Sequence, residues 1–437
     1  MEIKVVKFGG SSLADANQFK KVKEIVTAEE SRRYVVASAP GKRSDDDIKV
    51  TDLLYKCFEL AIAKKDISEV FDKIVERYNG IIKDLDLDLS LEEELETIRA
   101  GIIHRASRDY VASRGEYLNA IIMANYLGYD FIDAESCIFF KEDGSLDTEK
   151  TNKVLSDILL EHQRAVFPGF YGCTNEGTIK TFSRGGSDIT GSIVARAIHA
   201  DIYENWTDVS GMLMADPRIV KNPKTIEVIT YGELRELSYM GASVMHEDAI
   251  FPVKVANIPI NIKNTNAPSD PGTMIVPATS ISAPNIITGI AGKKGFSIIN
   301  IEKDMMNAEI GFGRKVLEVL ENHNVCFEHL PSGIDTMSVV ISTDELRNTK
   351  YEMVAEIAKV VNADRVTVEE GIALVAVVGR SMEKAKGTAC RLFTSIASKD
   401  INIKMIDQGS SERNIIIGVD EHDYQDAINA IYSEFVK

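Results

Sequence analysis

Residues 178–188, TIKTFSRGGSD, join a β-like run to a glycine pair, and a helical pattern follows from Ile189 to Ala200. Residues 2–12, EIKVVKFGGSS, repeat this order with a second glycine pair, and a helical pattern follows them. Glycine lets the backbone approach an anion closely, and the free N–H groups and dipole of the following helix favour negative charge. With Lys7 beside one turn and Arg184 beside the other, the two turns predict one site that holds two anionic groups.

Strand-like and helical patterns alternate from Met1 to Ile275. Short apolar runs predict strands at residues 34–38, 165–167, 203–206, 254–256 and 259–262, and a largely helical block spans residues 53–127. The alternation predicts an α/β fold, with an open and mostly parallel sheet and helices on both faces. Ligands of such sheets bind beyond the carboxyl ends of the strands, and both glycine turns follow strand ends.

The pattern changes after residues 266–272, NAPSDPG, which mark the predicted domain boundary. Beyond them a ferredoxin-like βαββαβ unit is predicted from strands at 297–303, 325–330, 336–342 and 364–369 and helices at 312–323 and 344–362. A second copy is predicted from strands at 372–378, 402–407 and 413–419 and two amphipathic helices, at 389–397 and 424–435. This copy lacks a fourth strand, which residues 285–291 would supply if the first copy is inserted within the second. The predicted domains are residues 1–284, residues 297–369, and residues 285–296 together with 370–437.

The composition limits the class of partner. The chain of 437 residues carries 50 Lys and Arg against 67 Asp and Glu, a formal net charge of −17, which argues against nucleic acid or an anionic membrane surface. The five cysteines, at positions 57, 137, 173, 326 and 390, lack CxxC spacing and histidine partners, so we expect reduced thiols in the cytoplasm. No apolar run approaches ~18 residues, so neither a transmembrane helix nor a signal peptide is expected.

Eight short motifs follow one another along the chain: KFGGSS at 7–12, ASAP at 37–40, TDLL at 51–54, SRGE at 113–116, PGF at 168–170, RGGSD at 184–188, WTD at 206–208 and ADPR at 215–218. This order resembles that of the aspartate kinases, and residues 407–412, DQGSSE, resemble the second of their two regulatory ACT domains. Glutamate, carbamate and uridylate kinases share the catalytic fold but would not be expected to carry this set with a tandem ACT tail. The chain has no GxxxxGK[ST] loop, so a kinase of the P-loop type is excluded.

The resemblance implies the residues of the catalytic site. Those for ATP are Lys7, Gly9, Gly10 and Ser11 at the phosphates, and Thr207, Asp208, Asp216, Arg218 and Lys263 along the nucleotide. Those for L-aspartate are Ser38, Thr51, Glu116 on the α-ammonium, Arg184 on the α-carboxylate, Gly185, Gly186 and Ser187. Lys7 and Asp188 are the implied catalytic residues, and Asp188 is also expected to cap its helix. The family commonly carries a lysine near position 266, where this chain has Asn266, and Lys263 is the nearby replacement.

The implied reaction is the ATP-dependent phosphorylation of the β-carboxylate of L-aspartate to 4-phospho-L-aspartate. An aspartate side chain has a pKa near ~3.9 and is already an ionised nucleophile at neutral pH, so no general base is required. Mg²⁺ is expected to arrive on ATP, without dedicated protein ligands.

The ACT tail implies feedback regulation by an end-product amino acid, with lysine the favoured effector and threonine the second. The implied effector-binding residues are Met305, Met306, Gly311, Phe312, Glu328, Ser332, Gly333, Ile334 and Asp335. ACT units are expected to pair between chains, which would give a homodimer or a tetramer. The alternative class is a non-catalytic amino-acid sensor with a degenerate kinase fold, and the intact Lys7, Arg184 and Asp188 argue against it.

Overall fold

The computed structural model describes residues 2–183, 185–242, 245, 247–278 and 285–436. The chain divides into two compact units, and each is described by itself. The first comprises Met1–Met212, Thr225–Tyr231 and Val244–Thr279, and the second comprises Leu213–Lys224, Gly232–Ser243 and Ser280–Lys437. Every helix in the described part of the chain is too short or too polar to span a lipid bilayer.

The first unit is built on an eight-stranded sheet with the strand order β3-β5-β2-β1-β8-β10-β11-β9. Its strands are β1 (Lys4–Phe8), β2 (Arg32–Ala37), β3 (Asp130–Phe131), β5 (Ala165–Pro168), β8 (Ile202–Thr207), β9 (Val228–Thr230), β10 (Ile260–Asn264) and β11 (Thr273–Val276). All neighbouring pairs are parallel except β10 with β11. The open, mostly parallel sheet predicted from the sequence is therefore confirmed.

Helices and a small second sheet complete the first unit. The helices are α1 (Ala16–Thr27), α2 (Val50–Ile62), α3 (Ser68–Asp84), α4 (Glu92–Ile103), α5 (Arg108–Leu127), α6 (Thr148–Glu161), α7 (Gly186–Ala197) and α9 (Glu247–Val255). The small sheet has the order β4-β6-β7, with β4 (Phe139–Phe140), β6 (Tyr171–Thr174) and β7 (Ile179–Thr181). Helix α8 (Tyr231–Tyr239) begins in the first unit and continues in the second.

The alternation of side chains along β1 decides which face of the sheet carries the site. Val6 and Phe8 point to the face whose buried core is shared with α1–α5. Lys7 therefore points to the opposite face, where α7 lies against β1, β2 and β8. In register, Lys7 lies opposite Asn205 of β8.

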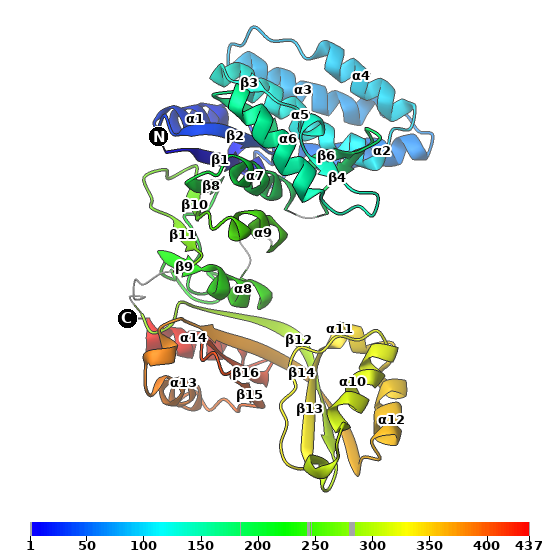
Figure 1. Cartoon of the computed structure of the whole chain (residues 1–437), viewed down its shortest axis with the longest axis vertical. Helices are drawn as coiled ribbons and strands as arrows, with labels where there is room; N and C mark the ends of the chain where they lie inside the picture. The colour runs from blue at the N-terminus through cyan, green and yellow to red at the C-terminus, as the bar shows by residue number, and fades with distance from the viewer. Residues whose placement is uncertain (1, 184, 243–244, 246, 279–284, 437) are drawn as a thin grey trace. The chain divides into compact units, whose positions relative to one another are not determined.

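The second unit contains a five-stranded antiparallel sheet with the order β13-β12-β14-β16-β15. Its strands are β12 (Gly289–Glu302), β13 (Thr336–Ser342), β14 (Arg365–Val378), β15 (Met405–Asp407) and β16 (Asn414–Asp420). Its helices are α10 (Phe312–Asn322), α11 (Thr343–Leu346), α12 (Lys350–Val360), α13 (Thr388–Ala397) and α14 (Tyr424–Phe435). The long strands β12 and β14 lie side by side and run through the whole sheet (Figure 1).

The pairing of β12 with β14 joins two halves of this unit. Gly289 lies opposite Val378 at one end of the ladder, and Glu302 lies opposite Arg365 at the other. The predicted pairing of residues 286–291 with the second copy is therefore present from Gly289 onward. Two register shifts in β12 let the ladder continue where separate strands were expected. The predicted domain limits at 296/297 and 369/370 fall inside β12 and β14, and the limit at 284 lies outside the described residues.

Some predicted elements are wrong in detail. Residues 254–256 belong to α9 and its end, not to a strand, because Ala249, Ile250 and Val253 form one buried helical face. Residues 325–330 do not form a continuous strand. His329 makes only an isolated bridge to Val340, and the following Pro331 has no N–H to continue the ladder. The helix predicted at 344–362 is broken into α11 and α12, and the strand predicted at 402–407 is shortened to β15.

Candidate active site

The centre of the candidate site is an ion pair between Lys7, at the end of β1, and Asp188, in the first turn of α7. The Lys7 Nζ lies 2.6 Å from Asp188 Oδ1, and both the Lys7 ammonium and the Asn205 side-chain amide donate hydrogen bonds within this cluster. Lys7 is buried, with 7% of its surface exposed. The structure thus brings the two predicted catalytic residues into direct contact, although 181 positions (188 − 7) separate them in the sequence.

The first glycine turn is shaped by close backbone packing. A Cβ added at Gly9 would lie 3.5 Å from Lys7 Nζ, so the turn passes directly beside the buried ammonium. A Cβ at Gly10 would lie 2.9 Å from the Ala39 carbonyl oxygen, and one at Gly41 would lie 2.6 Å from the Gly10 carbonyl carbon. Only glycine fits at positions 10 and 41 without a shift of the backbone. The turn and residues 39–41 therefore form one closely packed backbone cluster.

The second glycine turn opens α7. Gly185 has φ 59° and ψ 27°, the left-handed region that favours glycine, and no side chain caps the helix. A Cβ at Gly169 would lie 2.6 Å from the Ser187 side chain, so the turn packs against the segment after β5. The N-terminal N–H groups of α7 are a suitable anion site. Arg184, predicted beside this turn, lies outside the described residues.

The prediction that Asp188 caps α7 is wrong. The residue preceding the helix is Gly185, and Asp188 lies inside the first turn. Its carboxylate is instead held by Lys7 and Asn205, which reach it from neighbouring strands. A carboxylate in the first turn still interacts favourably with the helix dipole.

Glu116 lies on α5 and is 6% exposed. Burial raises the pKa of Glu116 to about 8, against a smaller opposing effect of a hydrogen bond from the backbone of Ala39. Its Oε2 atom is buried without a hydrogen-bond partner among the described residues. A buried carboxyl oxygen with unused acceptor capacity is suited to receive an ammonium group.

Ser38 and Thr51 lie at the two ends of the segment that follows β2. The Ser38 N–H donates to the Phe8 carbonyl, and its own carbonyl accepts from the Asn119 side chain at 2.6 Å. Thr51 is the second residue of α2. The segment between them therefore connects the first glycine turn to the helix that carries Glu116.

The residues predicted along the nucleotide are divided between the two units. Thr207 ends β8 and donates to Asp208, and the Lys263 ammonium lies 5.3 Å from the centre of the Trp206 ring. Asn266 accepts hydrogen bonds from Gln18 and Lys21. Asp216 and Arg218 belong to the second unit, where they form an ion pair of 2.6 Å with each other.

The predicted effector residues lie in the second unit, in the segment between β12 and β13 that includes α10. The Asp335 carboxylate accepts from the Met305 N–H at 3.0 Å, and the Ile334 carbonyl accepts from Asn307. Met305 and Ile334 are mostly exposed, whereas Met306 and Phe312 belong to the buried core beside α10.

The other predicted effector residues belong to the same unit. Gly311 precedes α10 in the left-handed conformation, and Glu328 accepts from the Tyr239 hydroxyl. Ser332 forms an isolated bridge with Met337, and the Gly333 N–H donates to Thr336. The structure thus brings Met305, Ile334 and Asp335 together at one end of the sheet and directs Met306 and Phe312 inward.

Sequence reasoning missed Asn205, Ala39 and Gly41. Asn205 directly precedes the WTD motif on a predicted strand, so its place opposite Lys7 could have been inferred had the strand order been known. Gly41 directly follows the ASAP motif, but its role depends on contact with Gly10, which no local pattern indicates.

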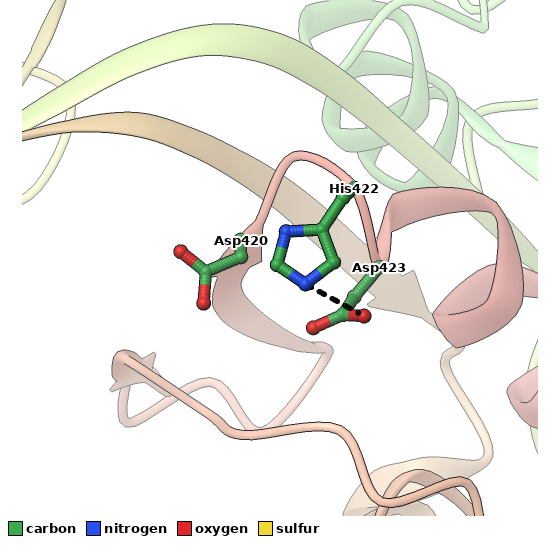
Figure 2. Close-up of side chains that lie close together, drawn as sticks. All are labelled: Asp420, His422 and Asp423. Atoms are coloured by element: carbon green, nitrogen blue, oxygen red, sulfur yellow. Dashed lines mark ion pairs between the residues drawn. The ribbon is translucent and has the colours of Figure 1, made fainter.

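One group of metal-ligand side chains lies in the second unit, at Asp420, His422 and Asp423 (Figure 2). The His422 ring pairs with Asp423 at 3.3 Å, and the side chain of His422 is 78% exposed. The Lys404 ammonium lies 3.5 Å from the Asp420 carboxylate, so part of the negative charge of this group is already compensated. We assign no metal to this exposed group.

Comparison with known proteins agrees with this geometry. Residues 2–264 match the model of the amino acid kinase family, and residues 375–435 match an ACT domain. Aspartokinase 3 of Bacillus subtilis is 41% identical over 99% of this chain and 98% of its own length. The crystal structure of aspartate kinase from Clostridium acetobutylicum has a TM-score of 0.90 and 51% identity, and all of each chain is covered.

Aspartokinase III of Escherichia coli is a more distant relative. Its complexes with aspartate and ADP and with lysine and aspartate each have a TM-score of 0.74 and 26% identity, with at least 99% of each chain covered. These relatives do not favour the alternative of a non-catalytic sensor. The match over more than half of the chain, together with the paired Lys7 and Asp188, places this chain in the amino acid kinase family, as an aspartate kinase.

Proposed function

We propose that the buried Lys7 ammonium is the group that neutralises the transferring phosphoryl group of ATP. The observation that carries this proposal is its contact with Asp188 and Asn205 beside both glycine turns. The N–H groups of Gly10 and Ser11 would hold the phosphates on one side. The predicted phosphate contact of the Gly9 N–H is wrong, because this N–H donates to the Trp206 carbonyl at 3.0 Å. Asp188 would hold the ammonium in place and so keep it aimed at the phosphate.

The nucleophile in this proposal is the β-carboxylate of L-aspartate, and the product is 4-phospho-L-aspartate. A carboxylate needs no base, so catalysis depends on in-line positioning and on neutralising charge at the γ-phosphate. Mg²⁺ would arrive on ATP and neutralise phosphate charge, and the carboxylate oxygens of Asp188 are the donor type that this ion prefers. Thr207, Asp208 and Lys263 of the first unit would contact the rest of the nucleotide.

Aspartate recognition would use groups of opposite charge. The unpartnered Oε2 of Glu116 would accept from the substrate α-ammonium, and Arg184 would bind the α-carboxylate in its planar fork. The N–H groups of Gly185, Gly186 and Ser187 at the start of α7 would add to the anion site. Ser38 and Thr51 would line the pocket from the segment after β2.

The test is the Lys7→Met variant, which keeps an unbranched side chain only one atom shorter and removes its charge. We expect turnover of ATP and aspartate to fall by at least about three orders of magnitude, because electrostatic stabilisation of the transferring group is lost. The matched control is Lys73→Met, at a half-exposed lysine on α3 whose ion partner is Glu69. Circular dichroism checks that both variants fold, and wild-type turnover in a folded Lys7→Met protein would refute the role.

We also propose that lysine is the effector and that it binds in the segment between β12 and β13, with threonine as the second candidate. The Asp335 carboxylate and the exposed Met305 and Ile334 offer an anionic group and apolar contacts for a long aliphatic cation. The complex of the Escherichia coli relative with lysine and aspartate supports this choice. We expect lysine to raise the melting temperature and lower the rate, and no response to either amino acid would refute the proposal.

The exposed apolar side chains of this region favour pairing between chains. Ile310 is 97% exposed, and Met305 and Ile334 lie on the same unit, so a second copy would remove apolar surface from water. We propose a homodimer through the ACT units, or a tetramer built from it.

All five cysteines are free thiols, which favours a cytoplasmic location.

A further inference from the structure

Residues 38–41 contact both parts of the candidate site. On one side, the Gly41 N–H donates to the Gly10 carbonyl at 2.8 Å, and a Cβ at Gly41 would lie 2.8 Å from the Ser11 nitrogen. On the other side, a Cβ at Gly115 would lie 2.9 Å from the Ala39 Cβ, and Glu116 follows in the same helix. We call residues 38–41 the linking segment. Any displacement of this segment would therefore move both Glu116 and the first glycine turn, residues 9–11, which we call the phosphate turn.

One buried side chain holds the far end of the linking segment. Arg77 of α3 donates from Nη1 to the Gly41 carbonyl at 2.9 Å, and the exposed fraction of the residue is 6%. Its Nη2 donates to both carboxylate oxygens of Asp47, at 2.8 and 2.7 Å. Asp47 also accepts hydrogen bonds from the backbone and side chain of Arg43. Residues 42–47, which follow the linking segment, are therefore tied to Arg77 through Asp47.

The planar guanidinium of Arg77 is suited to hold the Gly41 carbonyl and the Asp47 carboxylate at the same time. It addresses a neutral carbonyl and a carboxylate at once, with directions that a lysine ammonium cannot reproduce. Burying a cation is costly unless it is paired and hydrogen-bonded, and here both conditions are met within the loop. The Arg77 cation thus fixes the carbonyl of Gly41, and Gly41 itself packs against Gly10 and Ser11.

We infer that Arg77 is a positioning residue for phosphoryl transfer, acting through the linking segment on the phosphate turn and on the Glu116 side of the site. The inference rests on the proposed nucleotide role of Gly10 and Ser11. The hydrogen bonds of Arg77 go to Gly41, Asp47 and Ile48, and none of these is a predicted substrate-binding residue. Loss of Arg77 would therefore affect the use of both substrates, whereas loss of a contact residue would mainly affect one.

The experiment compares Arg77→Met with wild type in full-length protein, at a temperature where circular dichroism shows both to be folded. We expect kcat/KM to fall by at least about tenfold for ATP and also for aspartate, because hydrogen bonds to a charged group are lost. Guanidinium chloride at non-denaturing millimolar concentration should restore part of the activity, since it can occupy the vacated site. The control Arg99→Met removes a partly exposed arginine of α4 that binds Ser68, and both kcat/KM values should stay unchanged.

The outcomes separate this inference from the proposed function. A lower melting temperature with wild-type KM and kcat for both substrates would show that Arg77 only supports the fold, and would overturn the inference. If Arg77→Met does not fold, Arg77→Lys is used instead, because it keeps a positive charge beside Asp47 but cannot bind Asp47 and the Gly41 carbonyl together. The same comparison of KM and kcat for both substrates then tests the inference. Full turnover by Lys7→Met would instead refute the proposed role of the Lys7 ammonium, whatever the Arg77 variants show.

Discussion

Glu116 offers the most informative perturbation of this protein, because its burial has opposite consequences for stability and for substrate binding. The substitution Glu116→Gln keeps the shape of the side chain and an acceptor oxygen for the Ala39 N–H, but the glutamine side chain cannot ionise. We expect a protein that is more stable at alkaline pH and that uses aspartate poorly. Few surface substitutions would combine these effects.

The magnitude follows from the pKa of Glu116, which burial raises from 4.5 to about 8. A raised pKa means that the folded protein holds the proton more tightly than the unfolded chain, so stability falls as the pH rises from 4.5 to 8. By linkage, ionisation of Glu116 costs the folded state roughly 1 kcal/mol at pH 5, about 3 kcal/mol at pH 7 and about 5 kcal/mol at pH 9. The difference in stability between Glu116→Gln and wild type should therefore grow by about 4 kcal/mol between pH 5 and pH 9.

The assay is urea unfolding of both proteins at pH 5, 7 and 9, without ligand and with saturating aspartate. An α-ammonium bound at Glu116 stabilises the carboxylate, so aspartate should reduce the alkaline loss of stability in wild type alone. In steady-state kinetics, kcat/KM for aspartate should rise with pH and level off above about 8 in wild type. Glu116→Gln should lower that ratio by at least about tenfold at pH 8, because a charge-assisted hydrogen bond is lost.

A matched control is Glu93→Gln, at an exposed glutamate in the first turn of α4. Its stability curve should run parallel to that of wild type across the pH range. Parallel curves for Glu116→Gln as well would refute the reasoning, since they would show that burial does not disfavour the ionised carboxylate. Unchanged use of aspartate would separately refute the contact with the substrate ammonium.

Three further substitutions test the packing and the site. Arg32→Met leaves the buried carboxylate of Glu204 without its main partner, so we expect unfolding free energy to fall by about 3 kcal/mol in urea; a loss under ~1 kcal/mol would contradict this. Gly191→Ala places a Cβ 2.6 Å from the fully buried Tyr203 ring, and calorimetry should show a loss of about 2 kcal/mol with lower kcat, because α7 is displaced. Arg184→Ala should raise the KM for aspartate far more than that for ATP, and an unchanged aspartate KM would count against its role.

The local features of the site could be predicted from the sequence because they depend on short spacings. Alternation along residues 2–8 indicates a strand, and each glycine pair before a helical period indicates a turn that accepts an anion. The alternating order of elements also indicates the α/β class of the first unit, which the observed sheet confirms. The motif order and its resemblance to aspartate kinases named the family correctly.

Other features depend on contacts between distant segments, and no local pattern encodes them. The ion pair of Lys7 with Asp188 and the place of Asn205 require the register of β1 against β8. The burial that raises the pKa of Glu116 requires α5 to pack on the linking segment. The sequence by itself determined the backbone periods and the turn chemistry, because these arise from the conformational preferences of neighbouring residues. Only the tertiary structure decided which charges are buried and paired, because the dielectric environment of a side chain is set by residues remote in the chain.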